Sequence, residues 1–430
     1  MKKRTIIVRG PALSRSGYGE QCRFALRALR SREDILDIYL INTNWGKTSW
    51  ITEDDEERRW IDALLMKTNM LIQQQKQPRF DASLQVTIPN EWQPMAPINI
   101  GYTAGIETSK IAPQWIEKSM AMNHIITISQ HSKGVYESTT YEAVNKETGQ
   151  AVSDFRCKTP ITVVNYPVRK FDDVELDIDF ETDFNFLAVA QWGPRKNMEN
   201  TVRWFVEEFI DKEVGLVLKT FFANSSNPDM QDTLESLKSL LNSYPDRKCK
   251  VYLIHGAMSD AEMNSLYKHP KIKSLITLTH GEGFGLPIFE AAYNALPVIA
   301  PGWSGQCDYL YMPQKNKKGK RFKMKPKFTK VSYELGPIPE NAVWDGVLQA
   351  DAQWCYPDQG SFKMALKDTV NNYNQKQTQA TQLQKWIVEN FTEEKKYEEF
   401  VDCILKYVPV SKEDKEAIDW NQQISQMQVL

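Results

Sequence analysis

Short apolar runs alternate with segments of helical period along most of the chain. The runs are rich in Val, Ile and Leu and are bounded by turn residues, which is typical of buried parallel strands. The predicted strands are 5–8, 36–41, 98–102, 125–128 and 161–164, then 186–190, 216–220, 251–254, 275–278 and 298–300. The predicted helices include 20–30, 113–122, 198–210, 229–241, 260–267 and 287–294. This alternation predicts an α/β protein with doubly wound parallel sheets.

The pattern occurs twice, and 430 residues exceed one ordinary domain. An acidic segment without a clear period, 168–185, separates the two occurrences. We therefore predict a Rossmann-like domain over 1–170, a connection at 171–184 and a second Rossmann-like domain over 185–390. Residues 391–430 are predicted C-terminal helices that pack back on the first domain, including a helix over 414–427. Ligands of such sheets bind beyond the carboxyl ends of the strands, so the predicted site is a cleft between the domains.

Composition narrows the class of protein. The net charge of −2 gives no whole-chain attraction to polyanions, so nucleic-acid binding requires a local patch. Six cysteines without a C-x-x-C pair indicate reduced thiols in a cytosolic protein. The start, MKKRTIIVRG, predicts a strand and not a signal peptide, and no apolar run is long enough to span a bilayer. We expect a cytoplasmic protein without a transmembrane segment, in the host cytoplasm if viral, and peripheral membrane contact stays open.

The stretch LITLTHGEGFGLPIFEAAYNALPVIAPGWSG carries the most chemical information. A strand runs into a turn with Gly281, Gly283 and Gly285, and a helix follows with Pro287 near its first turn, where proline is tolerated. Glycines let the backbone approach a ligand closely. The free N–H groups of the helix start suit an anion such as a diphosphate.

Two carboxylates flank this turn. Helical rise places Glu282 and Glu290 roughly 10 Å apart, which is too far for the carboxyl pair of a retaining hydrolase. Separate roles along one extended ligand fit better, with Glu282 at a sugar and Glu290 at a ribose diol. The alternative is a plain strand–turn–helix with two surface glutamates.

EGFGLPIFEAAYNALPVIA resembles the signature of glycosyltransferase family four, retaining enzymes of the GT-B fold. The resemblance implies that the first glutamate contacts the donor sugar, the glycine turn holds the diphosphate and the second glutamate binds the ribose. By this resemblance the catalytic and donor-binding positions are Glu282, then Gly283, Phe284, Gly285 and Leu286, then Glu290.

Two further segments match the family. In GPRKNMENTVRWF, Arg195 and Lys196 follow a predicted strand, and two cations there can neutralise a diphosphate. The family carries a basic pair at this place, although a solvated surface pair is the alternative. In VYLIHGAMSDAEMNSLY, the loop after the strand borders the nucleobase in the family, which implies donor contacts from His255, Gly256, Ala257 and Met258. The alternative is a simple turn, and we do not expect His255 to be a catalyst.

The first domain adds weaker candidates. PALSRSGYGEQ holds a lone G-x-G, Gly17 and Gly19, which the family implies at the donor phosphates. Arg15 beside it is a candidate for donor or acceptor. Where many family members have a histidine, this chain has Glu107, a candidate for the donor sugar or the acceptor hydroxyl, with a buried structural carboxylate as the alternative. His131 begins a predicted helix, and we expect a capping or surface role for it.

The implied reaction is transfer of a hexosyl or pentosyl group from a UDP- or GDP-sugar with retention of configuration. We predict no metal and no further cofactor, because Arg195, Lys196 and helix amides stabilise the leaving diphosphate. The only D-x-D, Asp177 and Asp179, lies in the acidic connection and indicates a solvated run. A nucleotide-sugar epimerase and a non-catalytic carbohydrate-binding module are the rival classes.

The acceptor is the least determined element. The segment 312–330 is rich in Lys and Arg and has no acidic residue. A basic strip beside the cleft suits the phosphate backbone of DNA, and some viral enzymes resembling this family glycosylate hydroxymethylated pyrimidines in DNA. Our acceptor candidates are Arg15, Lys317, Lys318, Lys320 and Arg321. The segment could instead be a solvated loop, or it could bind an anionic lipid surface or an acidic glycan. The alternative acceptor is a saccharide or a lipid-linked molecule.

Overall fold

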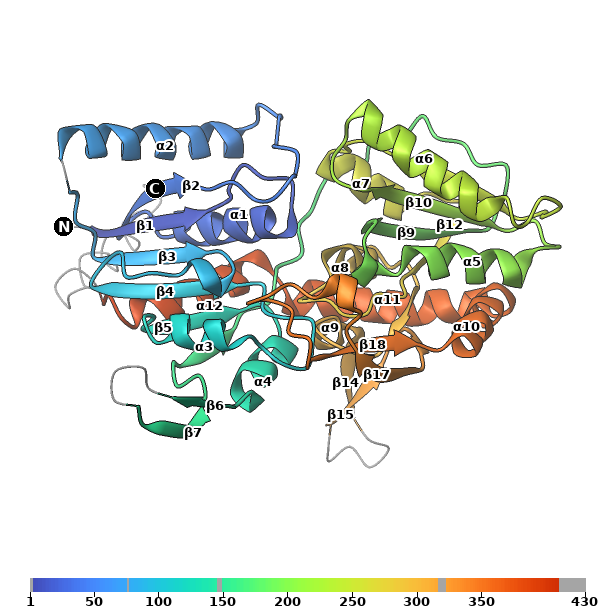
Figure 1. Ribbon diagram of the computed structural model, residues 1–430. Coiled ribbons are helices and arrows are strands. Elements are labelled where there is room, and N and C mark those ends of the chain that lie inside the picture. The colour runs from blue at the N-terminus through green and yellow to red at the C-terminus, as the bar shows by residue number, and fades with distance from the viewer. Residues whose placement is uncertain (1–2, 76, 145–148, 316–321, 410–430) are drawn as a thin grey trace, which may run out of the picture.

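A computed structural model describes residues 3–75, 77–144, 149–315 and 322–409 of the chain. Two six-stranded sheets lie side by side, each flanked by helices, and every strand pairing within them is parallel (Figure 1). The predicted α/β fold with two Rossmann-like sheets is confirmed.

The first half contains the sheet β2-β1-β3-β4-β5-β8. Its strands are β1 (Arg4–Gly10), β2 (Leu36–Asn42), β3 (Ala82–Val86), β4 (Ile98–Thr103), β5 (His124–Thr127) and β8 (Ile161–Val163). Its helices are α1 (Gly17–Arg30), α2 (Glu56–Gln74), α3 (Pro113–Ser119) and α4 (Gln130–Ser138), with a short 3₁₀ turn at Pro89–Glu91.

The second half contains the sheet β11-β10-β9-β12-β13-β16. Its strands are β9 (Asn185–Gln191), β10 (Gly215–Phe221), β11 (Lys250–Ile254), β12 (Ile272–Ile276), β13 (Val298–Pro301) and β16 (Thr329–Val331). Its helices are α5 (Met198–Phe209), α6 (Asn227–Leu241), α7 (Asp260–Tyr267), α8 (Leu286–Tyr293), α9 (Cys307–Leu310), α10 (Gln359–Asn371) and α11 (Tyr373–Asn390). The central strands are buried almost throughout, as their continuous apolar runs require.

Two strands of the parallel sheets, β3 and β16, were not predicted, and neither were the strands of the hairpins described below. In β3, Ser83 and Gln85 interrupt the apolar run, yet both are buried because they hydrogen-bond within the sheet: the Ser83 hydroxyl donates to Asn99 Oδ1 at 2.8 Å. Edge strand β16 lies inside the basic segment, where charge masked its strand character. Strand β12 also begins and ends earlier than the predicted 275–278, so the loop that follows it is longer.

The chain crosses between the halves twice, and the two crossings touch. The connection between β8 and β9 passes beside the chain that follows α11, where the Val168 N–H donates to the Phe391 carbonyl at 2.7 Å. The next helix, α12 (Glu393–Leu405), returns to the first half. There Phe400 packs against Phe24 of α1 and Tyr102 of β4, with ring centroids 5.3 and 5.0 Å apart. The predicted helix over 414–427 lies outside the described residues.

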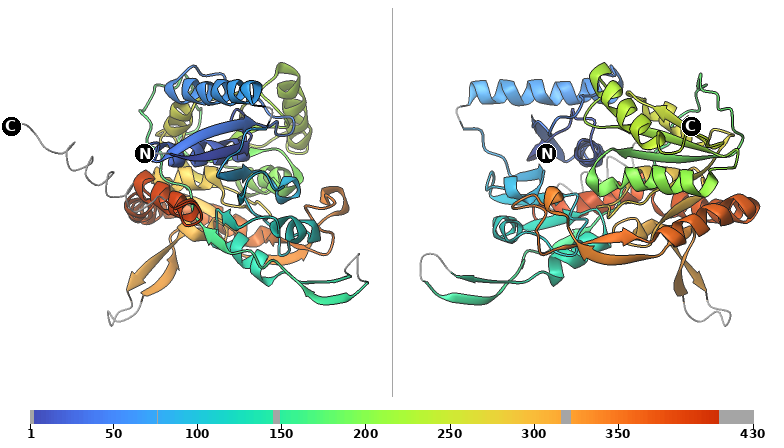
Figure 2. Two further views of the ribbon diagram at one scale, coloured as in Figure 1. Left: turned by 90° about the vertical axis from the view of Figure 1, so that its left-hand side faces the viewer. Right: turned by 45° about the vertical axis from the view of Figure 1, so that its right-hand side comes forward.

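Three antiparallel hairpins decorate this frame. They are β6 (Tyr141–Val144) with β7 (Ala151–Phe155), β14 (Tyr311–Lys315) with β15 (Phe322–Pro326), and β17 (Tyr333–Pro337) with β18 (Gln353–Pro357). The first two project away from the body on the lower side of the molecule (Figure 2). Among the helices that the structure describes, none has the length and apolar character needed to cross a membrane.

Candidate active site

A cavity of about 1030 Å³ lies between the two halves. Its wall comes from loops at the carboxyl ends of strands, including Gly17 after β1, Glu107 after β4, Arg195 after β9 and Glu282 after β12. A smaller cavity of about 260 Å³ adjoins it and shares Arg15 among its lining residues. The predicted position beyond the strand ends therefore holds a real cavity.

Helix α8 begins at this cavity without a side-chain cap. Gly285 precedes it in the left-handed region, with φ of 87°, a conformation that glycine adopts without steric cost. The segment from Gly283 to Pro287 lines the cavity. Because Gly285 offers no side-chain oxygen, Pro287 has no N–H and the Ile288 N–H donates to the Gly285 carbonyl at 3.0 Å, the Leu286 N–H is the helix donor that remains available to an anion.

Two of the motif glycines serve contact between the halves. A Cβ at Gly281 would lie 2.4 Å from the Glu107 carbonyl oxygen, and one at Gly283 would lie 2.5 Å from the Ala104 carbonyl oxygen. The close approach that we expected toward a ligand is, at these positions, an approach to the backbone of the first half. The glycines bring Glu107 to the second half's motif.

Four charged side chains meet at this contact. Arg195 pairs through Nε with Glu107 at 2.9 Å and through Nη1 with Glu282 at 3.2 Å. The Lys196 ammonium lies 2.5 Å from the other oxygen of Glu282. Arg195 and Lys196 occupy a 3₁₀ turn at Pro194–Lys196, directly after β9. All four residues line the large cavity, so the structure brings together the four catalytic candidates.

The charges determine the protonation of this cluster. Burial by itself raises the pKa of Glu282, but the Lys196 and Arg195 charges outweigh it and hold that pKa at about 2. Burial and the neighbouring Arg195 charge lower the pKa of Lys196 below its usual value. Two cations and two carboxylates thus form a neutral set beside the uncapped helix. An entering diphosphate can compete with the carboxylates for both cations.

Glu290 lies in a different environment. It projects from α8, lines the same cavity and accepts a hydrogen bond from the Tyr267 hydroxyl of α7 at 2.8 Å. Burial raises the pKa of Glu290 to about 8, and the Tyr267 hydrogen bond only partly offsets this effect. The two motif glutamates therefore differ in charge at neutral pH, which is consistent with separate roles.

The loop after β11 meets the smaller cavity. Gly256, Ala257 and Met258 line it, whereas His255 turns away, with its Nε2 2.8 Å from Oδ1 of the buried Asp229. Lys219, which the sequence analysis missed, lines this cavity and donates to the Gly256 carbonyl at 2.5 Å. Burial lowers the pKa of Lys219 to about 8. A lysine at the end of an apolar strand is the signal that would have found it.

The candidate residues of the first half, Gly17, Gly19 and Arg15, do not all lie at the cavity. Gly17 lines the large cavity, but Gly19 does not, and a Cβ at Gly19 would lie 1.9 Å from the Ser14 carbonyl oxygen. Packing of α1 against the loop that precedes it accounts for Gly19. Arg15 lines both cavities, donates to the Met258 carbonyl at 3.3 Å and pairs with Glu53. The structure places Arg15 at the contact with the β11 loop.

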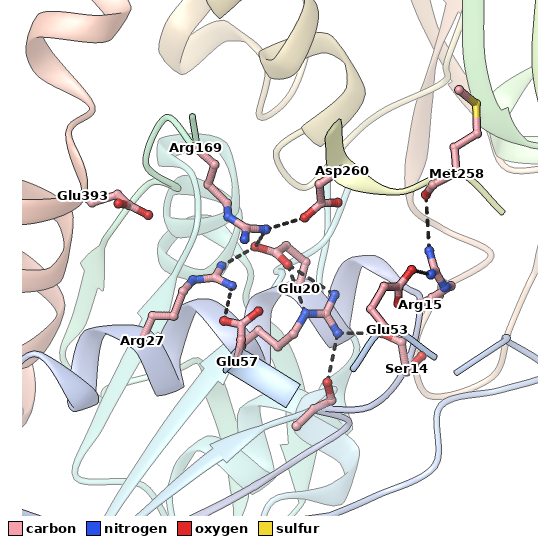
Figure 3. A network of polar contacts seen from close by, with 12 residues as sticks. Ser14, Arg15, Glu20, Arg27, Glu53, Glu57, Arg169, Met258, Asp260 and Glu393 are labelled. Atoms are coloured by element: carbon pink, nitrogen blue, oxygen red, sulfur yellow. Dashed lines mark hydrogen bonds and ion pairs between the residues drawn. The ribbon is translucent and has the colours of Figure 1, made fainter. Parts of the chain in front are cut away.

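Glu20, which lines the large cavity, links the two halves through ion pairs. Glu20 of α1 pairs with Arg27 and, at 3.5 Å, with Arg169 of the connection, which also pairs with Asp260 of α7 at 2.9 Å (Figure 3). Burial opposes ionisation of Glu20, but the neighbouring arginines hold its pKa at about 2. Sequence offered no signal for this network, because its members are far apart along the chain.

The expectation for His131 was wrong. The side chain of Ser129, and not His131, caps α4. The His131 ring packs edge-on against Trp303 of the second half, with centroids 4.9 Å apart, and burial lowers its pKa to about 4. His131 therefore forms a ring contact between the halves.

The described residues of the basic segment do not line the cleft, contrary to our expectation. Its described residues form β14, β15 and β16, and none of these residues lines either cavity. Lys315, Lys323 and Lys325 lie on the projecting hairpin. The acceptor candidates Lys317, Lys318, Lys320 and Arg321 lie outside the described residues.

Two Rossmann-like halves around a cavity define the GT-B fold, and comparisons with solved structures agree. The chain resembles the sucrose-phosphate synthase of Thermosynechococcus elongatus with a TM-score of 0.59, 11% identity and coverage of 95% of this chain and 100% of the other. It resembles HepE of Anabaena, solved with UDP and glucose, with a TM-score of 0.54, 11% identity and coverage of 94% and 100%. It resembles a glycosyltransferase from Rickettsia africae with a TM-score of 0.54, 13% identity and coverage of 96% of this chain and 100% of the other. The GT-B fold that the sequence resemblance implied is confirmed.

A sequence comparison adds a similarity over a shorter stretch. The chain is 30% identical over 115 residues to the serotype-specific mannosyltransferase WbdA of Escherichia coli. The match covers 27% of this chain and only 13% of the length of that relative. No family model matches the chain.

Proposed function

We propose that the protein is a retaining glycosyltransferase that transfers a sugar from a nucleotide-sugar donor to a saccharide acceptor. The observation that carries the proposal is the convergence of Arg195, Lys196, Glu282 and Glu107 on one cavity, beside the uncapped start of α8. Cations and free amides at one point suit a diphosphate, and carboxylates beside them suit sugar hydroxyls.

Each residue has a stated role. Arg195 and Lys196 bind the diphosphate and stabilise the charge that develops as it leaves, together with the amides of Gly285 and Leu286. Glu282 accepts hydrogen bonds from the donor sugar, and Glu290 binds the ribose hydroxyls. The nucleobase enters the smaller cavity beside Gly256 and Met258. The acceptor hydroxyl attacks on the face from which the diphosphate departs, and a phosphate oxygen takes its proton.

The relatives guide the choice of substrates. The solved structure of HepE with UDP and glucose makes a UDP-sugar the first donor to test, with a mannosyl donor next because of WbdA. The name of a further GT-B structure, the lipopolysaccharide outer core galactosyltransferase WaaB (TM-score 0.52, 10% identity), favours a saccharide or lipid-linked acceptor. These names, and a basic hairpin whose described residues line neither cavity, favour a saccharide over DNA.

A thermal-shift screen with UDP- and GDP-sugars tests donor binding. A donor at 100 times its dissociation constant stabilises the folded protein by about 2.7 kcal/mol. With the donor found, Glu282→Gln should cut turnover strongly while the protein stays folded, and EDTA should leave turnover unchanged. Normal turnover of Glu282→Gln would falsify the role given to Glu282, and loss on chelation that manganese restores would reveal a metal requirement.

An epimerase is the second candidate, because it uses the same donor site. Incubation of the donor without acceptor separates the two classes, since an epimerase then produces isomerised nucleotide sugar and a transferase does not.

A further inference from the structure

The loop between β17 and β18, residues 338–352, extends from the second half and contacts the first (Figure 1). At its base the Ser109 N–H donates to the Gln353 carbonyl at 3.1 Å, and the Gln353 N–H donates to the Ser109 hydroxyl oxygen at 2.9 Å. Lys110 also pairs with Asp351. These contacts attach the loop two and three residues after Glu107, so it lies beside the charged cluster.

The tip of the loop is a tight turn that is also attached to the first half. The Leu348 N–H donates to the Trp344 carbonyl at 2.7 Å, and Gly346 provides the left-handed residue, with φ of 71°. The Gly346 carbonyl accepts a hydrogen bond from Asn90 Nδ2 at 2.8 Å. Asn90 is itself fixed, because its Oδ1 accepts from the indole of the buried Trp115 at 2.6 Å. The turn is therefore held rigidly against the first half.

The side chains of this turn differ in burial. Val347 is buried in an apolar cluster of the first half with Ile106 and Trp115, and Leu348 packs against the same cluster. Trp344 lines the large cavity and remains 55% exposed. An exposed indole on an anchored turn at the wall of a cavity is a feature of ligand sites more than of packing.

We propose that Trp344 is the platform on which a pyranose ring of the acceptor saccharide stacks, between the β17–β18 loop and Glu107. This rests on the proposed function, which it deepens by locating the acceptor. A pyranose presents a C–H face that fits an aromatic ring and hydroxyl edges that need acceptors. Trp344 supplies the flat apolar surface, and Glu107 supplies a carboxylate that lines the same cavity. The loop contributes the platform from the second half, so the acceptor binds only where both halves meet.

Saturation-transfer NMR on the full chain tests this without requiring turnover. The probes are methyl α-mannoside, methyl α-glucoside and methyl β-galactoside, each with and without UDP. In the wild type we expect saturation to be strongest on the ring C–H protons of at least one glycoside. Trp344→Ala should weaken the affinity for that glycoside about tenfold or more, and Trp344→Phe less, because a truncated tryptophan at a binding hot spot costs at least a factor of this size.

Trp50→Ala is the matched control, since Trp50 is 50% exposed and lines neither cavity. It should leave glycoside affinity within twofold, and all variants should bind UDP as the wild type does. Unchanged glycoside affinity in Trp344→Ala, an equal loss of UDP affinity, or no glycoside binding to the wild type each overturns the proposal. Failure of the proposed function looks different, because there the wild type binds no UDP or nucleotide sugar.

Discussion

At the scale of single residues, the candidate site consists of ion pairs between two cations and two carboxylates. A bound diphosphate would compete with the carboxylates for the cations. Glu282 is buried against both Lys196 and Arg195, and Arg195 also holds Glu107 from the other half. A buried carboxylate is stable only while its partners remain. The same residues that would bind the diphosphate therefore also stabilise the ligand-free protein, which makes their contributions measurable without a substrate.

A double-mutant cycle measures this coupling. Lys196→Ala leaves Glu282 with one cation, and we expect the free energy of unfolding to fall by about 1–3 kcal/mol. Combining Lys196→Ala with Glu282→Gln should cost less than the sum of the single changes, by about 1–2 kcal/mol in denaturant unfolding. The control is Arg59→Ala, whose exposed pair with Asp54 should contribute less than about 1 kcal/mol. Additive effects at Lys196 and Glu282 would contradict the pairing.

Glu290 gives a prediction in pH. Its folded-state pKa of about 8 lies above its ordinary value of 4.5, so the folded protein holds this proton more tightly than the unfolded chain. Its contribution to stability is complete below pH 4.5 and is lost as pH rises toward 8. Denaturant unfolding at pH 5.5 and pH 8 should show a smaller fall for Glu290→Gln than for the wild type. An identical fall in both, with the exposed Glu340→Gln as control, would show that Glu290 ionises normally.

At the scale of elements, predictability from sequence followed the continuity of the apolar pattern. Strands such as β9 and β10 were found because their apolar runs are unbroken, while β3 was missed because Ser83 and Gln85 interrupt it. The motif around Glu282 can be recognised from the sequence because its residues are adjacent in the chain. Contacts between segments that are far apart in the chain cannot be predicted from one sequence. The salt bridge between Arg195 and Glu107, the Glu20 network and the placement of Trp344 all depend on such contacts.

The β14–β15 hairpin offers an element-scale test. Replacing residues 313–324 by a short Gly-Asn turn should leave UDP affinity and donor turnover within twofold, because the described hairpin residues line neither cavity. The hairpin exposes Phe322 and Met324 beside lysines, so its loss is also expected to improve solubility. Band-shift assays with duplex DNA at 50 and 200 mM salt complete the test. If the wild type retards DNA in a salt-sensitive way and the variant without the hairpin does not, DNA becomes the favoured acceptor.

At the scale of the whole molecule, the halves are joined tightly around the cavity. Two adjacent chain crossings, the return of α12, the Arg169 bridge and the β17–β18 loop all connect them. A donor held by the second half and an acceptor platform attached to the first would then meet at Glu107. On the proposed function, the architecture would bring the two substrates together in one cavity, as group transfer requires.

The most direct test of this account is the anomeric configuration of the product. An α-configured nucleotide sugar that binds the protein is incubated with the methyl glycoside that it recognises, and the new anomeric proton is observed by NMR. We predict transfer that yields an α-linked disaccharide, abolished in Glu282→Gln. A β-linked product, or an isomerised donor without any transfer, would contradict the account.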